Sequence, residues 1–208
     1  MDRPYPPASL LELSDLSEFG IRLIPAPEVW EWFQAEILAD TGSIHNEDHA
    51  HLLDADIRIM WASSSFEKQG RTVLGQAEQV AFRAGGWQKA RMEQQMRDWF
   101  GDVPAFIITL AADYCAQCSD LEFCALIEHE LLHAGQAKDE FGAPKFSKAG
   151  QPVFAMRGHD VEEFVSIVAR YGAKAAHVEA MVDAANKGPQ IAEVHIAQAC
   201  GTCQLRVA

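Results

Sequence analysis

The sequence has no apolar run long enough to cross a membrane. Its longest apolar stretch, residues 105–112, contains about eight residues, whereas a membrane-spanning helix needs roughly 20. The chain begins Met1-Asp2-Arg3-Pro4, with an acidic residue and early prolines where a secretion signal has a basic segment followed by an apolar one. We therefore expect a cytoplasmic protein with no membrane partner.

Basic residues are scarce as well. The 208-residue chain has 17 lysines and arginines against 30 aspartates and glutamates, which gives a formal net charge of -13. Such a surface repels the phosphate backbone of nucleic acids, and the sequence contains no local basic cluster that would offset this repulsion. We therefore expect no nucleic-acid partner.

Cysteines are few, and their number is odd. An odd number without a secretion signal argues against a disulfide framework. Four of the five cysteines form two Cys-x-x-Cys pairs, which could together close a second, structural zinc site with four thiolates. The alternatives are that these cysteines are small buried side chains, or that they form one reducible disulfide within or between the pairs. The pairs are Cys115 with Cys118 and Cys200 with Cys203, and we expect the fifth cysteine, Cys124, in the core.

Length and composition predict one globular domain over residues 1–208. Hydrophobic residues make up 49% of the chain and charged residues 23%, as in ordinary globular proteins. We expect an irregular N-terminal segment over 1–27, a core over about 50–172 and a helical extension over 173–208.

The apolar spacing predicts a few strands among segregated helices, which indicates an α+β fold. A polar loop is expected over 40–48 and a longer loop over 141–158. The expected strands are 56–61, 70–82 and 105–112, and the expected helices are 28–38, 86–100, 120–134, 160–172, 174–186 and 189–199.

Two of these helices carry a capping-box pattern at their predicted start. Ser119 with Glu122 matches Ser-x-x-Glu, and Asp160 with Glu163 repeats the form. We expect Gly135 to end the first of the two helices in the left-handed conformation.

The first capped helix contains the motif His129-Glu130-Leu131-Leu132-His133. Residues i and i+4 lie on one face of a helix, so both imidazoles can bind one metal ion. Glu130 lies about 100° around the helix from His129, where its carboxylate can reach a water molecule at the metal without becoming a ligand. Zinc lowers the pKa of such a water towards about 7, which suits proton transfer to a carboxylate.

A catalytic zinc usually has three protein ligands, so a third must come from elsewhere. His159 is the first candidate, because the preceding glycine-containing loop can bring it back over the helix. Glu163 and Glu162 are carboxylate alternatives, and Glu163 also has a capping role available. His177 and His195 are more typical of solvated helix positions. The cluster His45, His49 and His51 could bind metal, but we interpret it as an ordinary polar loop.

The residues from 129–134, 159–164 and 170–172, together with the pair Leu74-Gly75, resemble the phage metallopeptidase family. The likeness covers about residues 50–172. It implies a minimal zincin fold in which a small sheet packs on the motif helix, with His159 as third ligand and a phage or prophage origin. The chain is more distantly similar to SprT-like zinc metallopeptidases, from which it differs in its acidity, and this difference argues against DNA-dependent activity.

These observations together predict a zinc-dependent metallopeptidase acting on a peptide or protein. His129, His133 and His159 would bind Zn²⁺, and Glu130 would act as general base towards water and then as proton donor to the leaving amine. The strand near 107–111 would align the substrate backbone. The alternative is a non-catalytic, metal-stabilised structural or interaction protein on the same scaffold. The sequence does not indicate the oligomeric state.

Overall fold

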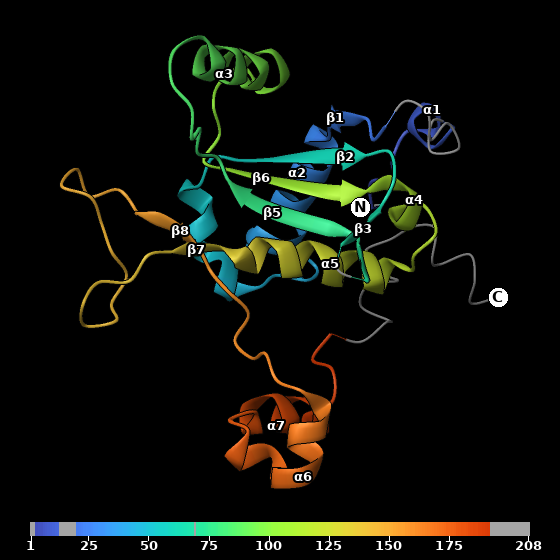
Figure 1. Cartoon of the computed structure of the whole chain (residues 1–208), viewed down its shortest axis with the longest axis vertical. Coiled ribbons are helices and arrows are strands. Elements are labelled where there is room, and N and C mark those ends of the chain that lie inside the picture. Colours follow the sequence, from blue (N-terminus) through green and yellow to red (C-terminus); the bar gives the residue numbers. More distant parts are fainter. Residues whose placement is uncertain (1–2, 13–19, 69, 192–208) are drawn as a thin grey trace.

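A four-stranded mixed sheet forms the centre of the molecule, and the computed structural model describes residues 3–12, 20–68 and 70–191. β2 runs parallel to β6, whereas each outer strand is antiparallel to its neighbour. The strand order, visible in Figure 1, is β1 (Leu23–Pro25), β2 (Ile57–Ala62), β6 (Phe106–Ala111) and β5 (Gly75–Gln79).

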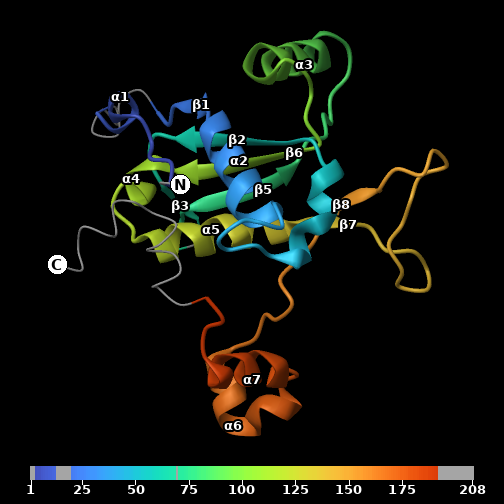
Figure 2. The same ribbon diagram turned by 180° about the vertical axis from the view of Figure 1, so that it is seen from behind.

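The two central strands carry the core. Alternate residues of β2 and β6 share one face of the sheet and are at most 2% exposed, as the period of a strand requires. They pack in one cluster with side chains from α2 (Pro27–Phe33), the π-helical segment η2 (Gln34–Leu38) and α5 (Asp120–His133). Figure 2 shows α2 lying across the sheet. The predicted α+β fold, with a small sheet packed on the motif helix, is confirmed.

The position of β6 corrects one prediction. Residues 107–111 cannot align a substrate backbone, because β6 is bonded to β2 on one side and to β5 on the other. Among the described residues, β5 pairs only with β6, so β5 is the free edge of the sheet on this side. The continuous apolar sequence of β6 suits a central strand, whereas Gly75-Gln76-Ala77-Glu78-Gln79 is half polar.

The predicted start of α5 is confirmed. Ser119 Oγ accepts from Glu122 N at 3.3 Å, while the Glu122 carboxylate accepts from Ser119 N at 2.8 Å. Its end lies one residue before the expected Ala134, but the expected left-handed stop at Gly135 is wrong. The helix stops at His133 without a left-handed residue, and Gly135 lies in the strand β7 (Ala134–Gln136). A Cβ on Gly135 would lie 3.1 Å from Arg157 Cβ, so the glycine permits a close strand contact.

The segment 141–158 is not wholly a loop as predicted, because it contains a short strand. β8 (Phe154–Met156) pairs antiparallel with β7. Each of these strands has only three residues, so no alternation in the sequence reveals them.

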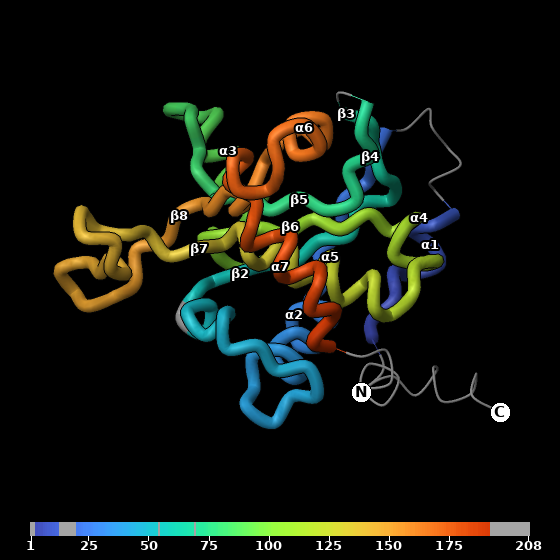
Figure 3. Tube along the Cα trace, turned by 90° about the horizontal axis from the view of Figure 1, so that it is seen from below, coloured from blue at the N-terminus to red at the C-terminus, as the bar shows by residue number. Residues whose placement is uncertain are grey.

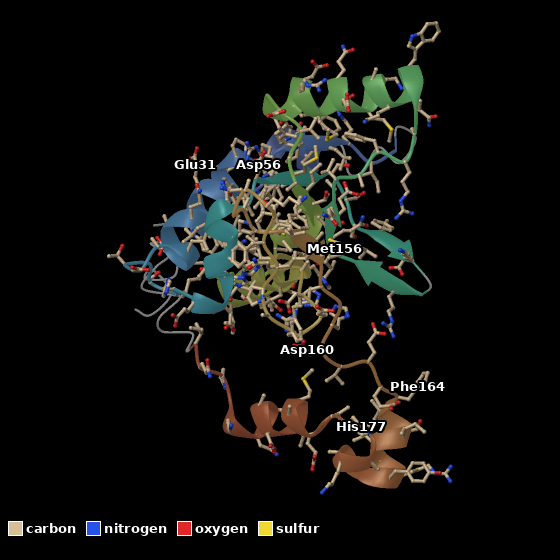
Figure 4. All side chains as sticks on the ribbon, turned by 90° about the vertical axis from the view of Figure 1, so that its left-hand side faces the viewer. Glu31, Asp56, Met156, Asp160, Phe164 and His177 are labelled. Atoms are coloured by element: carbon tan, nitrogen blue, oxygen red, sulfur yellow. The ribbon has the colours of Figure 1, made fainter. Side chains whose placement is uncertain are left out.

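The predicted helix start at Asp160 is also wrong. The Asp160 carboxylate accepts two bonds from Arg157 Nη2, at 2.7 and 3.0 Å, and α6 (Val165–Ala175) begins only after Phe164. Figure 4 shows Asp160 beside the main body, with Phe164 and His177 among the C-terminal helices. Asp160 therefore pairs with Arg157 and does not cap a helix.

Two C-terminal helices follow an extended connection, and Figures 1 and 3 show them on the α5 side of the molecule. α6 passes Gly172, whose φ of 83° breaks the helical path, and α7 (Glu179–Lys187) follows. The predicted helix over 189–199 is not helical at 189–191, and the rest of it lies outside the described residues.

The remaining elements refine the other predictions. The segment 1–27 contains a short helix and β1, and part of the expected loop over 40–48 is a 3₁₀ helix. The expected strand over 70–82 divides into β4 (Arg71–Val73) and β5. No described helix is both long and apolar enough to span a bilayer. These elements are α1 (Ala8–Leu11), η3 (Glu47–Asp54), β3 (Phe66–Lys68), β4 (Arg71–Val73), α3 (Gly86–Phe100) and α4 (Ala112–Cys115).

Candidate metal centre

The last turn of α5 presents His129 and His133 on one face. Their ring centroids are 5.1 Å apart, as expected for residues one helical turn apart. His129 is exposed and His133 half-buried, so both are accessible from solvent. The helix therefore supplies two imidazoles at an accessible surface.

The β7–β8 pair brings His159 to the same place. β8 runs alongside β7, and Arg157 N continues the ladder by donating to His133 O at 2.9 Å. Two residues later, His159 Nε2 lies 3.2 Å from His129 Nε2. Its ring centroid is 5.0 Å from that of His129 and 4.8 Å from that of His133.

The three histidines fit the donor set of a metal ion. One ligand nitrogen from each lies within 4.8 Å of the others, and this is the only such group of three found among the described residues. Two nitrogens bound to a tetrahedral zinc at about 2.0–2.1 Å are separated by roughly 3.3 Å, close to the 3.2 Å between His129 and His159. Neutral imidazole nitrogens suit zinc and its first-row neighbours.

A hydrogen bond at Nδ1 of His133 leaves the opposite ring nitrogen, Nε2, available to a metal ion. His133 Nδ1 lies 2.7 Å from Arg157 O, which can only accept, so Nδ1 carries the proton and Nε2 keeps its lone pair. Burial lowers the pKa of His129, and its neighbours His133 and His159 lower it further. The neutral form, which binds metals, is thereby favoured.

The carboxylates considered as third ligands occupy other positions. Glu162 Oε1 lies 3.5 Å from His159 Nδ1, where it can orient that ring. Glu163 accepts from the backbone N–H of Phe164 at 2.7 Å.

Glu130 is buried, with 5% of its surface exposed, and it interacts electrostatically with His133 and His159. It faces β5, where a Cβ on Gly75 would lie 2.7 Å from Glu130 Oε1. Burial raises the pKa of Glu130, and this rise is partly offset by His133 and by a hydrogen bond from the Ala77 N–H. A carboxylate with a raised pKa is suited to general-base chemistry near neutral pH.

A polar network behind α5 was missed in the sequence. His49 is fully buried, and its Nε2 lies 3.3 Å from Glu128 Oε2, which also accepts from Asn46 Nδ2 at 2.6 Å. His51 Nε2 lies 2.8 Å from Ala134 O. These histidines hold the metal-side end of α5 and do not form a metal cluster of their own. The sequence contains no sign of this network, because its partners lie about 80 positions apart. A different contact could have been anticipated, since a glycine within β5 signals that another group, here Glu130, approaches the strand closely.

The cysteine pairs are not brought together by the described part of the chain. Cys115 is the last residue of α4 and Cys118 lies between α4 and α5, whereas Cys200 and Cys203 lie outside the described residues. The four-thiolate zinc site stays a prediction. The expected core position of Cys124 is confirmed, since it is 5% exposed. His177 lies away from the cluster, and His195 is outside the described residues.

Comparison with known proteins agrees with the resemblance that the motifs carry. No curated protein and no solved structure gives a significant match to the chain. Residues 30–186, which are 157 of the 208, match the family described as putative phage metallopeptidase. That range contains the three histidines, Glu130 and the whole four-stranded sheet except β1. The chain therefore belongs to the phage metallopeptidase family.

Proposed function

We propose that the protein is a zinc-dependent peptidase in which His129, His133 and His159 bind the metal and Glu130 moves protons. The observation that carries this proposal is the convergence of three imidazoles near a buried carboxylate, beside a free sheet edge. A purely structural zinc usually has four protein ligands, and the described cluster offers three.

The bound metal would supply Lewis-acid polarisation of the scissile carbonyl and a more acidic water. Glu130 accepts a proton from the attacking water at its carboxylate and then donates it to the leaving amine. Its burial keeps bulk water away from the carboxylate, and the Ala77 N–H fixes the carboxylate against β5. Glu162 Oε1, 3.5 Å from His159 Nδ1, would accept a hydrogen bond from that nitrogen and so leave Nε2 free for the metal.

The outer edge of β5 would bind the substrate backbone. Leu74 O accepts from Ala111 N, and Val80 N donates to Ala105 O, so these flanking residues bond towards β6. Because antiparallel residues alternate, Gly75, Ala77 and Gln79 direct their backbone groups away from β6, and the Ala77 N–H among them already donates to Glu130. An extended peptide can add to this edge as a further strand, with its carbonyl near Glu130.

The family name leads us to infer a phage-encoded enzyme that acts in the cytoplasm of a bacterial host. A protein or peptide substrate follows from the peptidase family, and the exposed position of the histidines suits an unfolded or loop segment.

Cleavage of a complex peptide mixture by the zinc-loaded protein would test the proposal. New peptide termini would be identified by mass spectrometry for the wild type and for Glu130→Gln. We expect termini that require zinc and disappear with Glu130→Gln, while both proteins bind one zinc that His129→Ala loses. Equal cleavage by the Glu130→Gln variant would contradict the proposal. Zinc binding without any cleavage by the wild type would favour the non-catalytic alternative.

A further inference from the structure

A second chemically distinctive cluster lies at the opposite end of α5 from the histidines. Cys115 ends α4, and Cys118 immediately precedes Ser119, the N-cap of α5. Cys115 is fully buried, whereas Cys118 is half-buried. The pair therefore has one protected thiol and one that small solutes can reach.

The backbone places these cysteines one helical turn apart, so that a local shift can bring them to disulfide distance. Ala116 N donates to Ala112 O and Cys118 N donates to Tyr114 O, so α4 continues as helical turns through Cys118. Residues i and i+3 on such a turn have Cβ atoms about 5–6 Å apart, and a small adjustment brings them to disulfide geometry. Cys118 Sγ lies 3.8 Å from Cys115 O.

Arg3 fixes this turn from the N-terminal segment. Only 5% of Arg3 is exposed, and its guanidinium donates to Cys115 O at 3.0 Å and to Cys118 O at 2.8 Å. It also bonds Asp120 at 2.5 Å, and Nη1 lies 3.9 Å from Cys118 Sγ. The positive end of α5 lies on the same side, so two features favour a negative sulfur at Cys118.

The pKa values of the two thiols shift in opposite directions. Hydrogen bonding with Cys118 raises the pKa of Cys115, and burial raises it further. The same bond from Cys115 lowers the pKa of Cys118. Burial and the nearby Glu122 carboxylate raise it, but with the contribution of Arg3 the net shift is downward. Burial raises the pKa of Cys124 to about 12, so that thiol is inert near neutral pH.

We propose that Cys118 and Cys115 form a redox-active dithiol, with Cys118 as the attacking thiol and Cys115 as the resolving one, oxidised by low-molecular-weight disulfides. The guanidinium beside Cys118 disfavours a divalent cation there, and Asp120 is bonded to Arg3.

The chemistry proceeds by two exchanges. The Cys118 thiolate attacks one sulfur of glutathione disulfide, the sulfur–sulfur bond breaks, and one glutathione leaves as a thiolate that takes up a proton. Cys115 then loses its proton to solvent, and its sulfur attacks Cys118 Sγ and releases the second glutathione. The two cysteines lose two electrons and two protons, and one glutathione disulfide becomes two glutathione thiols.

Glutathione disulfide is the probe for the test, applied to the full-length chain with Cys200→Ser/Cys203→Ser so that the second pair is removed. After alkylation, mass spectrometry locates each modification. We expect a disulfide between Cys115 and Cys118, with Cys124 alkylated only after denaturation. Cys115→Ser should trap glutathione on Cys118, and Cys118→Ser should leave Cys115 unmodified.

The Arg3→Gln variant tests the effect of the Arg3 charge on Cys118 separately from any effect on folding. We expect the rate of Cys118 modification at pH 7 to fall about threefold for each unit by which the substitution raises the pKa, because the thiolate fraction falls tenfold while the nucleophilicity of the thiolate rises about threefold. Its pH profile should shift upward. Arg3→Lys should restore part of the rate, and circular dichroism establishes that each variant is folded. Glutathione trapped on Cys115 in the Cys118→Ser variant, or a bound zinc that Cys118→Ser releases, would overturn the proposal.

Discussion

Gly75 on β5 leaves the space that the carboxylate of Glu130 occupies. A Cβ on Gly75 would lie 2.7 Å from Glu130 Oε1 and 2.9 Å from its Cγ, closer than real Cβ contacts. The Glu130 carboxylate can therefore occupy its observed position because residue 75 has no side chain. Gly75 thus links the edge strand β5 to the residue that we propose as general base.

Gly75→Ala should thus displace Glu130 without removing a metal ligand. We expect peptidase activity to fall at least about 100-fold, because a positioned general base contributes roughly 10²–10⁴-fold. Zinc content should stay unchanged by elemental analysis. Gly85→Ala is the matched control, since its φ is −125° and its new Cβ would meet nothing within 4 Å. Unaltered activity in Gly75→Ala would show that Glu130 tolerates a different position.

Zinc affinity separates the third-ligand candidates. We expect His159→Ala to weaken zinc binding by more than about 100-fold, and Glu162→Gln by about tenfold or less, because removing a supporting residue costs 10–100-fold and Glu162 is exposed. Glu163→Gln, whose carboxylate bonds only its own segment among the described contacts, should change nothing. Competition with a chromogenic chelator measures all three. A larger loss for Glu162→Gln than for His159→Ala would reverse the assignment.

The stability of the metal-free protein should depend on Glu130 in a defined direction. Its folded-state pKa is raised by burial above the ordinary 4.5, so between these two values the folded state binds more protons than the unfolded state. The free energy of unfolding therefore falls as pH rises through that window, and the ionised carboxylate is destabilising at pH 7.

Glu130→Gln should accordingly raise the melting temperature of the metal-free protein at pH 7 and not below pH 4.5. About 1 kcal/mol corresponds to roughly 2–4 °C in a domain of this size, so a shift of a few degrees is expected. Glu31→Gln, on an exposed carboxyl of α2 that Figure 4 labels, should leave the melting temperature unchanged. A lower melting temperature for Glu130→Gln at pH 7 would mean that the Ala77 bond outweighs burial.

The motif helix was predictable because its signals are local. Ser119 and Glu122 fix its start, and the spacing of His129 and His133 puts both on one face, all within fifteen residues. The fold class followed from the same periodicities. The approach of His159 was expected from the loop before it and from the family resemblance.

The elements that place His159 were not predictable. β7 and β8 are three residues each and are separated by 17 residues, so their pairing leaves no periodic pattern. Asp160 matched a capping box, but Arg157 bonds it. Sheet order is likewise non-local, and for that reason the substrate-aligning role was assigned to β6, a central strand, although it requires an edge strand.

Glu128, directly before His129, provides the last prediction because it anchors α5 to the segment 46–49. Burial alone would raise the pKa of Glu128, but hydrogen bonds from His49 and Asn46 outweigh burial and lower it. The carboxylate therefore contributes stability above its unfolded pKa of about 4.5, and this contribution is lost as pH falls through the lower folded value. We expect Glu128→Gln to reduce the free energy of unfolding at pH 7 by about 1–3 kcal/mol, the range for bonds to a charged group, and much less at pH 3.

Urea unfolding of the metal-free protein at both pH values measures the difference, with the exposed Glu140→Gln as control. Zinc affinity should fall together with stability, because the same contacts position the turn that carries His129. Equal losses at pH 3 and pH 7 would instead assign the effect to packing and not to the charge of Glu128.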